Sequence, residues 1–431
     1  MPQLIESLKN LIFSEEFCSQ HKQNPKDFTR VRLLPFHALI FFLLNMNNKS
    51  YQYELDQYFK VINHLEVAER ILHKGNLSKA RSKLKYEAFV ELNDHMLKQF
   101  QETFQLETWH GFNLLAIDGT TLRVPDEAEI ANHFGVWNST KGKTPCPKAR
   151  ASQMFDVLNK LTVDAIISPK SDGERELAAL HFLKLQHGDL VLLDRGYPAY
   201  WLFVAALTMN AQFCARISYK RWKIVKKFYL SEQKEQVVKL EPSASSKRKC
   251  FEMGLDQKPI KVRLIRIELS SGETEILITS LTDKNAYPYE LFADLYHLRW
   301  PVEEDYKTMK YRVQIENFSG KSTHSVYQDF HAKMFSKNFA AVVACTTQKE
   351  ILKKSETLKY VHQINFAQAL AQMKNTIVLL FNRSIKKVSL LVEKLRKIFI
   401  QTTESVRPNR KFPRRHRVKQ QRFFPEYKTI C

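Results

Sequence analysis

Two aspartates in this sequence follow short apolar runs of the kind that form buried strands. Asn113-Leu-Leu-Ala-Ile117 ends on Asp118, and Leu190-Val-Leu-Leu193 ends on Asp194. Functional groups of α/β proteins often lie where a buried strand reaches the surface. Each aspartate could equally mark a turn or a local ion pair. Two of them in a chain without a glycine-rich phosphate loop nevertheless favour a pair of metal-binding carboxylates.

A third stretch of the chain combines an aromatic residue, two cations and a carboxylate. At ~100° per residue, offsets of 0, 3, 7 and 14 place them on one side of a helix: Tyr296, Arg299, Glu303 and Lys310. Pro301 should kink this helix or restart it. An exposed helix with Glu/Lys pairs is the alternative on spacing alone.

The same four residues satisfy the signature Tyr-x2-Arg-x3-Glu-x6-Lys, and the sequence resembles the DDE transposases of the insertion-sequence-four type. The blocks Ala116-Ile-Asp118-Gly-Thr and Leu193-Asp194-Arg195-Gly196-Tyr197 look like the segments that carry the two catalytic aspartates of that family. Further blocks extend the resemblance over most of the chain: Arg32-Leu-Leu-Pro35-Phe, Leu77-Ser-Lys-Ala-Arg81, Glu174-Arg-Glu-Leu-Ala178 and Arg407-Pro-Asn-Arg410.

The resemblance implies that Asp118, Asp194 and Glu303 are the catalytic residues and bind two Mg²⁺ ions, with Mn²⁺ as a substitute. Two divalent ions ~3.5–4 Å apart can neutralise a scissile phosphate, activate a water or a 3′-hydroxyl, and stabilise the leaving oxygen. Carboxylate oxygens are suitable ligands for Mg²⁺, so the site needs no His or Cys.

DNA is the expected partner, because 67 Lys and Arg residues against 45 Asp and Glu residues give a net charge of +22. The resemblance assigns Tyr296, Arg299 and Lys310 to the transposon-end strand. The basic segment after Ser78 and the basic tail add further candidate DNA contacts: Lys79, Arg81, Arg410, Arg414, Arg415 and Arg417. A solvated helix face is the alternative for the segment after Ser78.

A membrane partner is not expected, since the longest apolar run, Leu33–Leu44, is too short to span a bilayer. The six cysteines show no CxxC spacing, and residues 1–10 lack the layout of a signal peptide. We therefore expect a cytoplasmic protein, and the resemblance implies a prokaryotic one that associates with the nucleoid.

The predicted fold class is α/β, because buried strands alternate with helical patterns after residue 112. The resemblance implies a ribonuclease H-like core, assigned to residues 106–219 and 284–350. A β-rich insertion is expected at 220–283, with an exposed basic loop near Ser243–Lys249. Helical regions flank the core: residues 1–105 as an N-terminal DNA-binding region, and residues 351–431 as a C-terminal region with a basic tail.

These features predict a DNA transposase, an Mg-dependent polynucleotidyl transferase that works as a homodimer in a synaptic complex. It would bind the terminal inverted repeats, hydrolyse the 3′ strand and join the freed 3′-hydroxyl to target DNA by transesterification. Two alternatives stay open: an inactive or domesticated DNA-binding relative, and a nuclease without strand transfer. The terminal repeat, the target preference, a hairpin intermediate and cis or trans cleavage are not readable from the sequence.

Overall fold

The computed structural model describes residues 1–30, 32–137, 145–220, 222–269, 272–382, 388–407 and 428. The chain divides into two compact units. The first comprises Met1–Gln105, Arg123–Pro147 and Lys307–Cys431, and the second comprises Leu106–Leu122 and Lys148–Tyr306. The division of the sequence into an N-terminal region, a core, an insertion and a C-terminal region stays a prediction.

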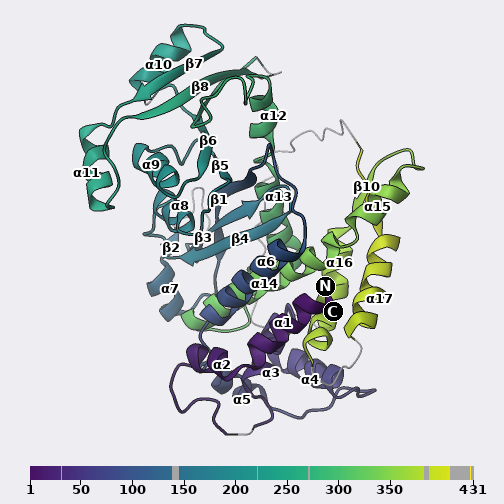
Figure 1. The fold of residues 1–431 in the computed structure, drawn as a ribbon. Coiled ribbons are helices and arrows are strands. Elements are labelled where there is room, and N and C mark those ends of the chain that lie inside the picture. Colours follow the sequence, from purple (N-terminus) through teal and green to yellow (C-terminus); the bar gives the residue numbers. More distant parts are fainter. Residues whose placement is uncertain are drawn as a thin grey trace. The chain divides into compact units, whose positions relative to one another are not determined.

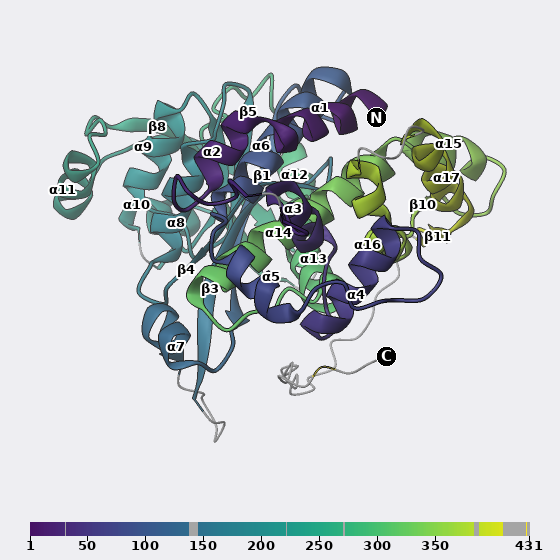
Figure 2. The same ribbon diagram turned by 90° about the horizontal axis from the view of Figure 1, so that it is seen from below.

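The first unit is mainly helical. Helix α14 (Thr323–Cys345) is buried along almost its whole length and lies beside α3 and α6 (Figure 2). The helices expected within residues 1–105 are present: α1 (Pro2–Phe13), α2 (Glu15–His21), α3 (Phe36–Leu44), α4 (Tyr51–Ile62), α5 (Lys74–Arg81) and α6 (Glu87–Thr103). The remaining elements are α7 (Ala128–Phe134), β2 (Val136–Trp137), the π-helix η1 (Met309–Val313), α15 (Gln348–Ser355), β10 (His362–Ile364), α16 (Phe366–Phe381), α17 (Val388–Gln401) and β11 (Thr403–Ser405).

The second unit is built on a mixed sheet. Its strands are β1 (Asn113–Arg123), β3 (Cys146–Asp156), β4 (Leu161–Ser168), β5 (Asp189–Leu193), β6 (Gln212–Ile217), β7 (Glu235–Leu240), β8 (Ile260–Glu268) and β9 (Thr274–Thr279). The order is β4-β3-β1-β5-β6-β9-β8-β7, with β1, β5 and β6 parallel and β4 antiparallel to β3. The α/β class is confirmed, and the first five strands have the order of a ribonuclease H-like core.

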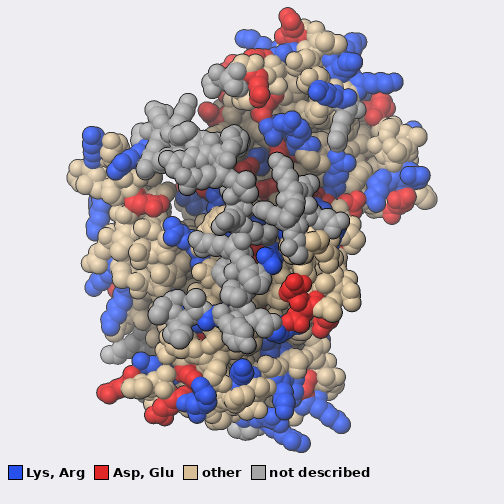
Figure 3. Space-filling model, turned by 180° about the vertical axis from the view of Figure 1, so that it is seen from behind, with Lys and Arg blue, Asp and Glu red and all other residues tan. Residues whose placement is uncertain are grey.

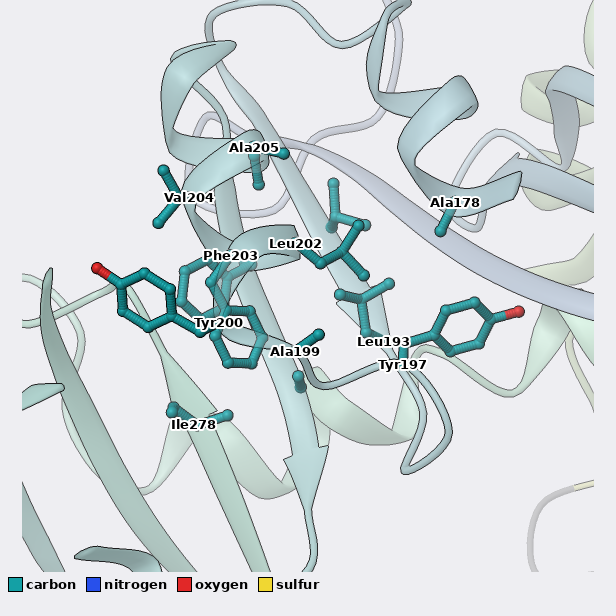
Figure 4. Packing of buried hydrophobic residues seen from close by; sticks show 14 of the residues in the cluster. Ala178, Leu193, Tyr197, Ala199, Tyr200, Leu202, Phe203, Val204, Ala205 and Ile278 are labelled. Carbon is teal, nitrogen blue, oxygen red and sulfur yellow. The ribbon is translucent and has the colours of Figure 1, made fainter. Parts of the chain in front are cut away.

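Successive residues of the central strands point to opposite faces of the sheet, and helices cover both faces (Figure 1). One face packs on α8 (Glu174–Phe182) and α9 (Tyr200–Thr208). Figure 4 shows α9 side chains against Leu193 and Ile278 on this face. The other face packs on α12 (Leu291–His297) and α13 (Pro301–Thr308) through Phe292, Leu295 and Val302. This second face carries the candidate site.

The segment predicted as a β-rich insertion contains strands β7, β8 and β9, and also two helices, α10 (Lys223–Leu230) and α11 (Ala244–Glu252). The prediction of an exposed loop near residues 243–249 is therefore wrong, because α11 occupies most of this segment. The Ser243 hydroxyl accepts a hydrogen bond from the Ser246 N–H and so caps the first turn of α11.

Across the described parts of the chain, no helix is both long enough and apolar enough to cross a membrane.

Candidate active site

The sheet brings the two predicted catalytic aspartates together. Strands β1 and β5 are parallel, with Ile117 paired to Leu193. The register extended by one residue sets Asp118 beside Asp194, and neighbouring strands are ~4.8 Å apart. Leu115 and Ile117 face α8 and α9, as do Val191 and Leu193. Because side chains alternate along a strand, both aspartates point to the face covered by α12 and α13.

Helices α12 and α13 bring the remaining residues of this group to the same face. Tyr296 lies near the end of α12, Arg299 lies in the turn that follows, and Glu303 lies in the first turn of α13. Pro301 starts α13, as the sequence predicted, because a first-turn proline needs no N–H partner. The four signature residues therefore do not share one continuous helix. Lys310 lies on η1, which belongs to the first unit.

Asp194 accepts two hydrogen bonds on one oxygen. Arg216 on β6 donates to Asp194 Oδ1 from Nε at 3.0 Å, and the Tyr296 hydroxyl donates to the same oxygen at 3.1 Å. Arg216 Nη2 forms an ion pair with this oxygen at 2.8 Å. Burial by itself raises the pKa of Asp194, but the Arg195 N–H and the charges of Arg299 and Arg216 outweigh it and lower the pKa below its ordinary value. Asp194 is thus ionised at neutral pH.

The pKa of Asp118 shifts in the opposite direction from that of Asp194. Burial raises its pKa to about 6, and the negative charges of Glu303 and Asp194 contribute to this rise, against the Gly119 N–H and the charge of Arg299. The negative charges of Glu303 and Asp194 therefore both act on the carboxyl of Asp118. The Tyr306 hydroxyl donates to the Asp118 carbonyl oxygen at 2.9 Å and ties α13 to the end of the apolar part of β1.

Arg299 is buried next to Glu303. Only 5% of the residue is exposed, its guanidinium lies 5.8 Å from the centre of the Tyr296 ring, and Nη2 donates to Glu303 Oε1 at 2.8 Å. Its Nε has no hydrogen-bond partner among the described residues. A buried donor without a partner costs free energy, so an anion that accepted this hydrogen bond would be stabilised.

The carboxylate oxygens of Asp118, Asp194 and Glu303 are the donors that Mg²⁺ prefers, and their chemistry fits a pair of such ions. Within the described ranges, no group of three His, Cys, Asp or Glu side chains is arranged so that it could hold a metal ion. Arg216 and Arg299 occupy an oxygen of Asp194 and of Glu303 respectively. Metal binding therefore requires these carboxylates to turn or to share their oxygens.

The remaining candidate DNA contacts have different environments. Lys79 is exposed on α5. Arg81 is buried and donates to Gln328, Ser319, the Ser325 carbonyl and Asp329. The prediction that Arg81 contacts DNA is wrong for this structure, because the interior of the helical unit takes up its guanidinium.

Arg410, Arg414, Arg415 and Arg417 of the tail lie outside the described residues. On the face seen in Figure 3, Lys and Arg side chains are spread widely with Asp and Glu among them. Surface charge on this face therefore does not mark a single DNA-binding surface.

Two residues next to Asp194 were not found from the sequence. Arg216 also forms an ion pair with Glu275 on β9. Ala215 pairs with Leu193 and Arg216 pairs with Leu277, so Asp194, Arg216 and Glu275 lie on three adjacent strands and point to one face. Only the register of these strands could have revealed the group.

Comparisons with known proteins identify the family of the chain. The family model described as "Transposase DDE domain" matches residues 109–339, more than half of the chain. The transposase InsG for insertion sequence element IS4 of Escherichia coli K12 is 22% identical over 393 residues, which are 89% of this chain and 86% of that protein. The putative transposase InsZ of the same organism is 28% identical over 116 residues, 27% of this chain and 38% of that protein.

Among solved structures, the piggyBac transposase synaptic complex with hairpin DNA aligns with a TM-score of 0.46 and 10% identity, over 92% of this chain and 85% of that chain.

Proposed function

Because the chain belongs to the transposase DDE domain family, we propose that it is a cut-and-paste DNA transposase with Asp118, Asp194 and Glu303 as its catalytic residues. It would bind the terminal inverted repeats of its element, hydrolyse the 3′ strand at each end, and join the freed 3′-hydroxyl to target DNA. No covalent link between protein and DNA is needed, since water and the 3′-hydroxyl are the two nucleophiles.

The observation that supports this proposal is the alignment of Asp118 with Asp194 on the face of the sheet that α12 and α13 cover. Parallel pairing aligns Asp118 with Asp194, and the charge of Glu303 from α13 raises the pKa of Asp118. A buried carboxyl whose pKa is raised, such as that of Asp118, is typical of sites that bind a ligand of opposite charge. A pair of Mg²⁺ ions, or Mn²⁺ ions in their place, is such a ligand.

The three carboxylates would hold the ions from two strands and one helix. When bound, the ions polarise the scissile phosphate and lower the pKa of a coordinated water. Arg299 would donate its unpartnered Nε–H to a phosphate oxygen of the transposon end, beside the reacting group. Tyr296 would orient Asp194 through its hydroxyl and contact the DNA strand beside it.

Other parts of the proposal concern binding and assembly. Lys310 on η1, Lys79 on α5 and the tail arginines would contact DNA phosphates. A homodimer would pair the two ends in a synaptic complex, and the protein would work in the bacterial cytoplasm at the nucleoid. These assignments rest on charge and on the family resemblance.

A cleavage assay tests the proposal. The full-length protein is incubated with Mg²⁺ and duplexes copied from the DNA on either side of its coding sequence, and products are resolved on denaturing gels. We expect 3′-strand nicking that Asp118→Asn, Asp194→Asn and Glu303→Gln each abolish. Glu252→Gln, which neutralises an exposed carboxylate on α11 of the same unit, should cleave normally.

Precleaved ends separate the remaining functions. Joining of a precleaved 3′ end to a plasmid identifies a transposase, whereas cleavage without joining identifies a nuclease. Binding without Mg²⁺-dependent cleavage would leave only an inactive DNA-binding relative. A denaturing-gel band at twice the strand length of the cut end would indicate a hairpin intermediate.

A further inference from the structure

Arg216 lies between two carboxylates on neighbouring strands. Its Nε donates to Asp194 Oδ1, its Nη2 forms an ion pair with the same oxygen, and its Nη1 pairs with Glu275 Oε1. The sheet fixes this arrangement: Asp194 follows β5, Arg216 is on β6, and Glu275 is the diagonal cross-strand neighbour of Arg216 on β9. The side chain of Arg216 is 22% exposed and that of Glu275 is 18% exposed, so water screens the group only in part.

The contact involves only one oxygen of Asp194. Both side-chain hydrogen bonds, one from Arg216 Nε and one from the Tyr296 hydroxyl, go to Oδ1, and Arg216 Nη2 forms an ion pair with the same oxygen. An ionised carboxylate oxygen offers about two lone-pair directions. Oδ1 is therefore saturated in this structure. An ion that binds Asp194 must either use Oδ2 or compete with the guanidinium of Arg216 for Oδ1.

The balance of charges at the site also indicates that metal binding needs a further anionic ligand. Asp118, Asp194, Glu303 and Glu275 supply four carboxylates, and Arg216 and Arg299 supply two permanent cations. With every carboxyl ionised, half of the negative charge is already neutralised inside the protein. Two Mg²⁺ ions carry more charge than the remaining two negative charges compensate, so DNA phosphates must supply the rest.

We propose that Arg216, anchored by Glu275, makes metal binding at this site conditional on DNA. Without DNA the guanidinium competes with the ions and keeps their affinity low. A bound DNA end brings phosphates whose charge offsets Arg216 and restores the affinity. By thermodynamic linkage the ions then strengthen DNA binding by the same factor. The inference rests on the proposed function, because it concerns the same metal site, and it makes Arg216 a positioning residue.

A metal-binding experiment with the full-length protein tests this role. Mn²⁺ serves as the probe, and the free ion is measured by electron paramagnetic resonance with and without a duplex from the DNA flanking the coding sequence. For wild type we expect DNA to strengthen Mn²⁺ binding. In Arg216→Gln without DNA, the affinity should rise by roughly tenfold, as expected when one positive charge is removed beside a partly solvated ion. The added effect of DNA should shrink accordingly.

Glu275→Gln provides the opposite perturbation. It removes a negative charge and leaves Arg216 with Asp194 as its only partner, so Mn²⁺ binding without DNA should weaken. Loss of pocket structure would instead weaken binding in both variants. Arg216→Lys keeps the charge and should bind Mn²⁺ as wild type does, and Glu252→Gln is the control for removal of a distant charge. Thermal unfolding checks that each variant is folded.

Three results would overturn the inference. Weaker or unchanged Mn²⁺ binding in folded Arg216→Gln would show that Arg216 orients Asp194 without opposing the ions. Equal effects of DNA in wild type and Arg216→Gln would show that the arginine does not couple the two ligands. If Asp194→Asn leaves Mn²⁺ binding unchanged, the proposed function itself is wrong. If it abolishes binding while Arg216→Gln does not raise affinity, only the present inference fails.

Discussion

Asp118 should make the fold less stable at neutral pH in the absence of metal, so Asp118→Asn should stabilise the protein. Its pKa rises from 3.8 to about 6 on folding, chiefly through burial. A difference of about two pKa units corresponds to roughly 3 kcal/mol at a pH well above both values. The carboxyl keeps some contact with water, so a gain of about 1–2 kcal/mol in the free energy of unfolding is the realistic expectation. Asparagine keeps the shape and can still accept the Gly119 N–H.

The direction of the pKa shift determines how the effect of Asp118 on stability varies with pH. The folded-state pKa of Asp118 lies above the unfolded value, so the folded state binds the proton more tightly. The unfavourable contribution of wild-type Asp118 is therefore largest above pH 6 and disappears as the pH falls from about 6 towards 3.8. Urea unfolding of wild type and Asp118→Asn in EDTA, at several pH values between these limits and at neutral pH, should show a difference that shrinks on acidification.

Asp164 is the matched control with the opposite sign. Burial would raise its pKa, but the hydrogen bond and charge of His181 and the charge of Lys184 outweigh burial and lower the pKa to about 2. His181 Nδ1 lies 2.7 Å from Asp164 Oδ2. The stabilisation by ionised Asp164 is present above pH 3.8 and is lost as the pH falls towards 2, so Asp164→Asn should cost about 2 kcal/mol at neutral pH. If Asp118→Asn destabilised the protein as much as Asp164→Asn does, or if its effect did not vary with pH, the electrostatic account of the site would be refuted.

Four other changes have expected outcomes. Arg81→Ala should lower the free energy of unfolding by about 3–5 kcal/mol in urea titrations, because it strands a buried carboxylate. Lys79→Ala on the exposed face of the same helix should change the free energy of unfolding by less than about 0.5 kcal/mol. It should weaken DNA binding measured by fluorescence anisotropy. Equal unfolding effects of the two variants would contradict a buried Arg81 and an exposed Lys79. Tyr296→Phe removes only the hydroxyl that donates to Asp194 and should slow single-turnover cleavage roughly tenfold, which corresponds to about 1.4 kcal/mol of activation free energy. An unchanged rate would exclude a role of this hydroxyl in orienting Asp194. Replacing Arg414 and Arg415 by Ala should reduce the salt dependence of DNA binding by about two ion equivalents, and an unchanged salt slope would remove the tail from the binding surface.

The sequence predicted the parts of the site that depend on local patterns. Asp118 and Asp194 follow apolar runs, and those runs are the buried parallel strands β1 and β5. Pro301 predicted a break, and α13 starts there. Such features follow from residues close together in the chain, because strand burial and helix starts are encoded locally.

Features that depend on residues far apart in the chain could not be predicted from the sequence. The basic pattern around Arg81 is typical of a solvated helix, but its partner Asp329 is 248 residues away. Arg216 and Glu275 are single charged residues in apolar strands, and their meeting depends on the registers of β5 with β6 and of β6 with β9. The prediction that Tyr296 to Lys310 lie on one side of a single helix was also wrong, because the chain forms two separate helices and a π-helix there.

The two aspartates at the centre of the site show why its arginines are needed. Asp118 and Asp194 end the apolar runs of adjacent strands, yet the pKa of Asp118 is raised and that of Asp194 is lowered. Burial raises both, and the pKa of Asp194 is nevertheless lowered by the Arg195 N–H and by the charges of Arg299 and Arg216, of which Arg216 donates a hydrogen bond to Asp194 directly. Without this compensation the buried carboxylates would repel one another, and folding would favour their protonated forms. The positive side chains among these carboxylates therefore offset part of their repulsion, and under the proposed function they would have to move when the metal ions bind. Arg216→Gln should for the same reason raise the pKa of Asp194, a change that the carboxyl chemical shift in an NMR titration would show directly.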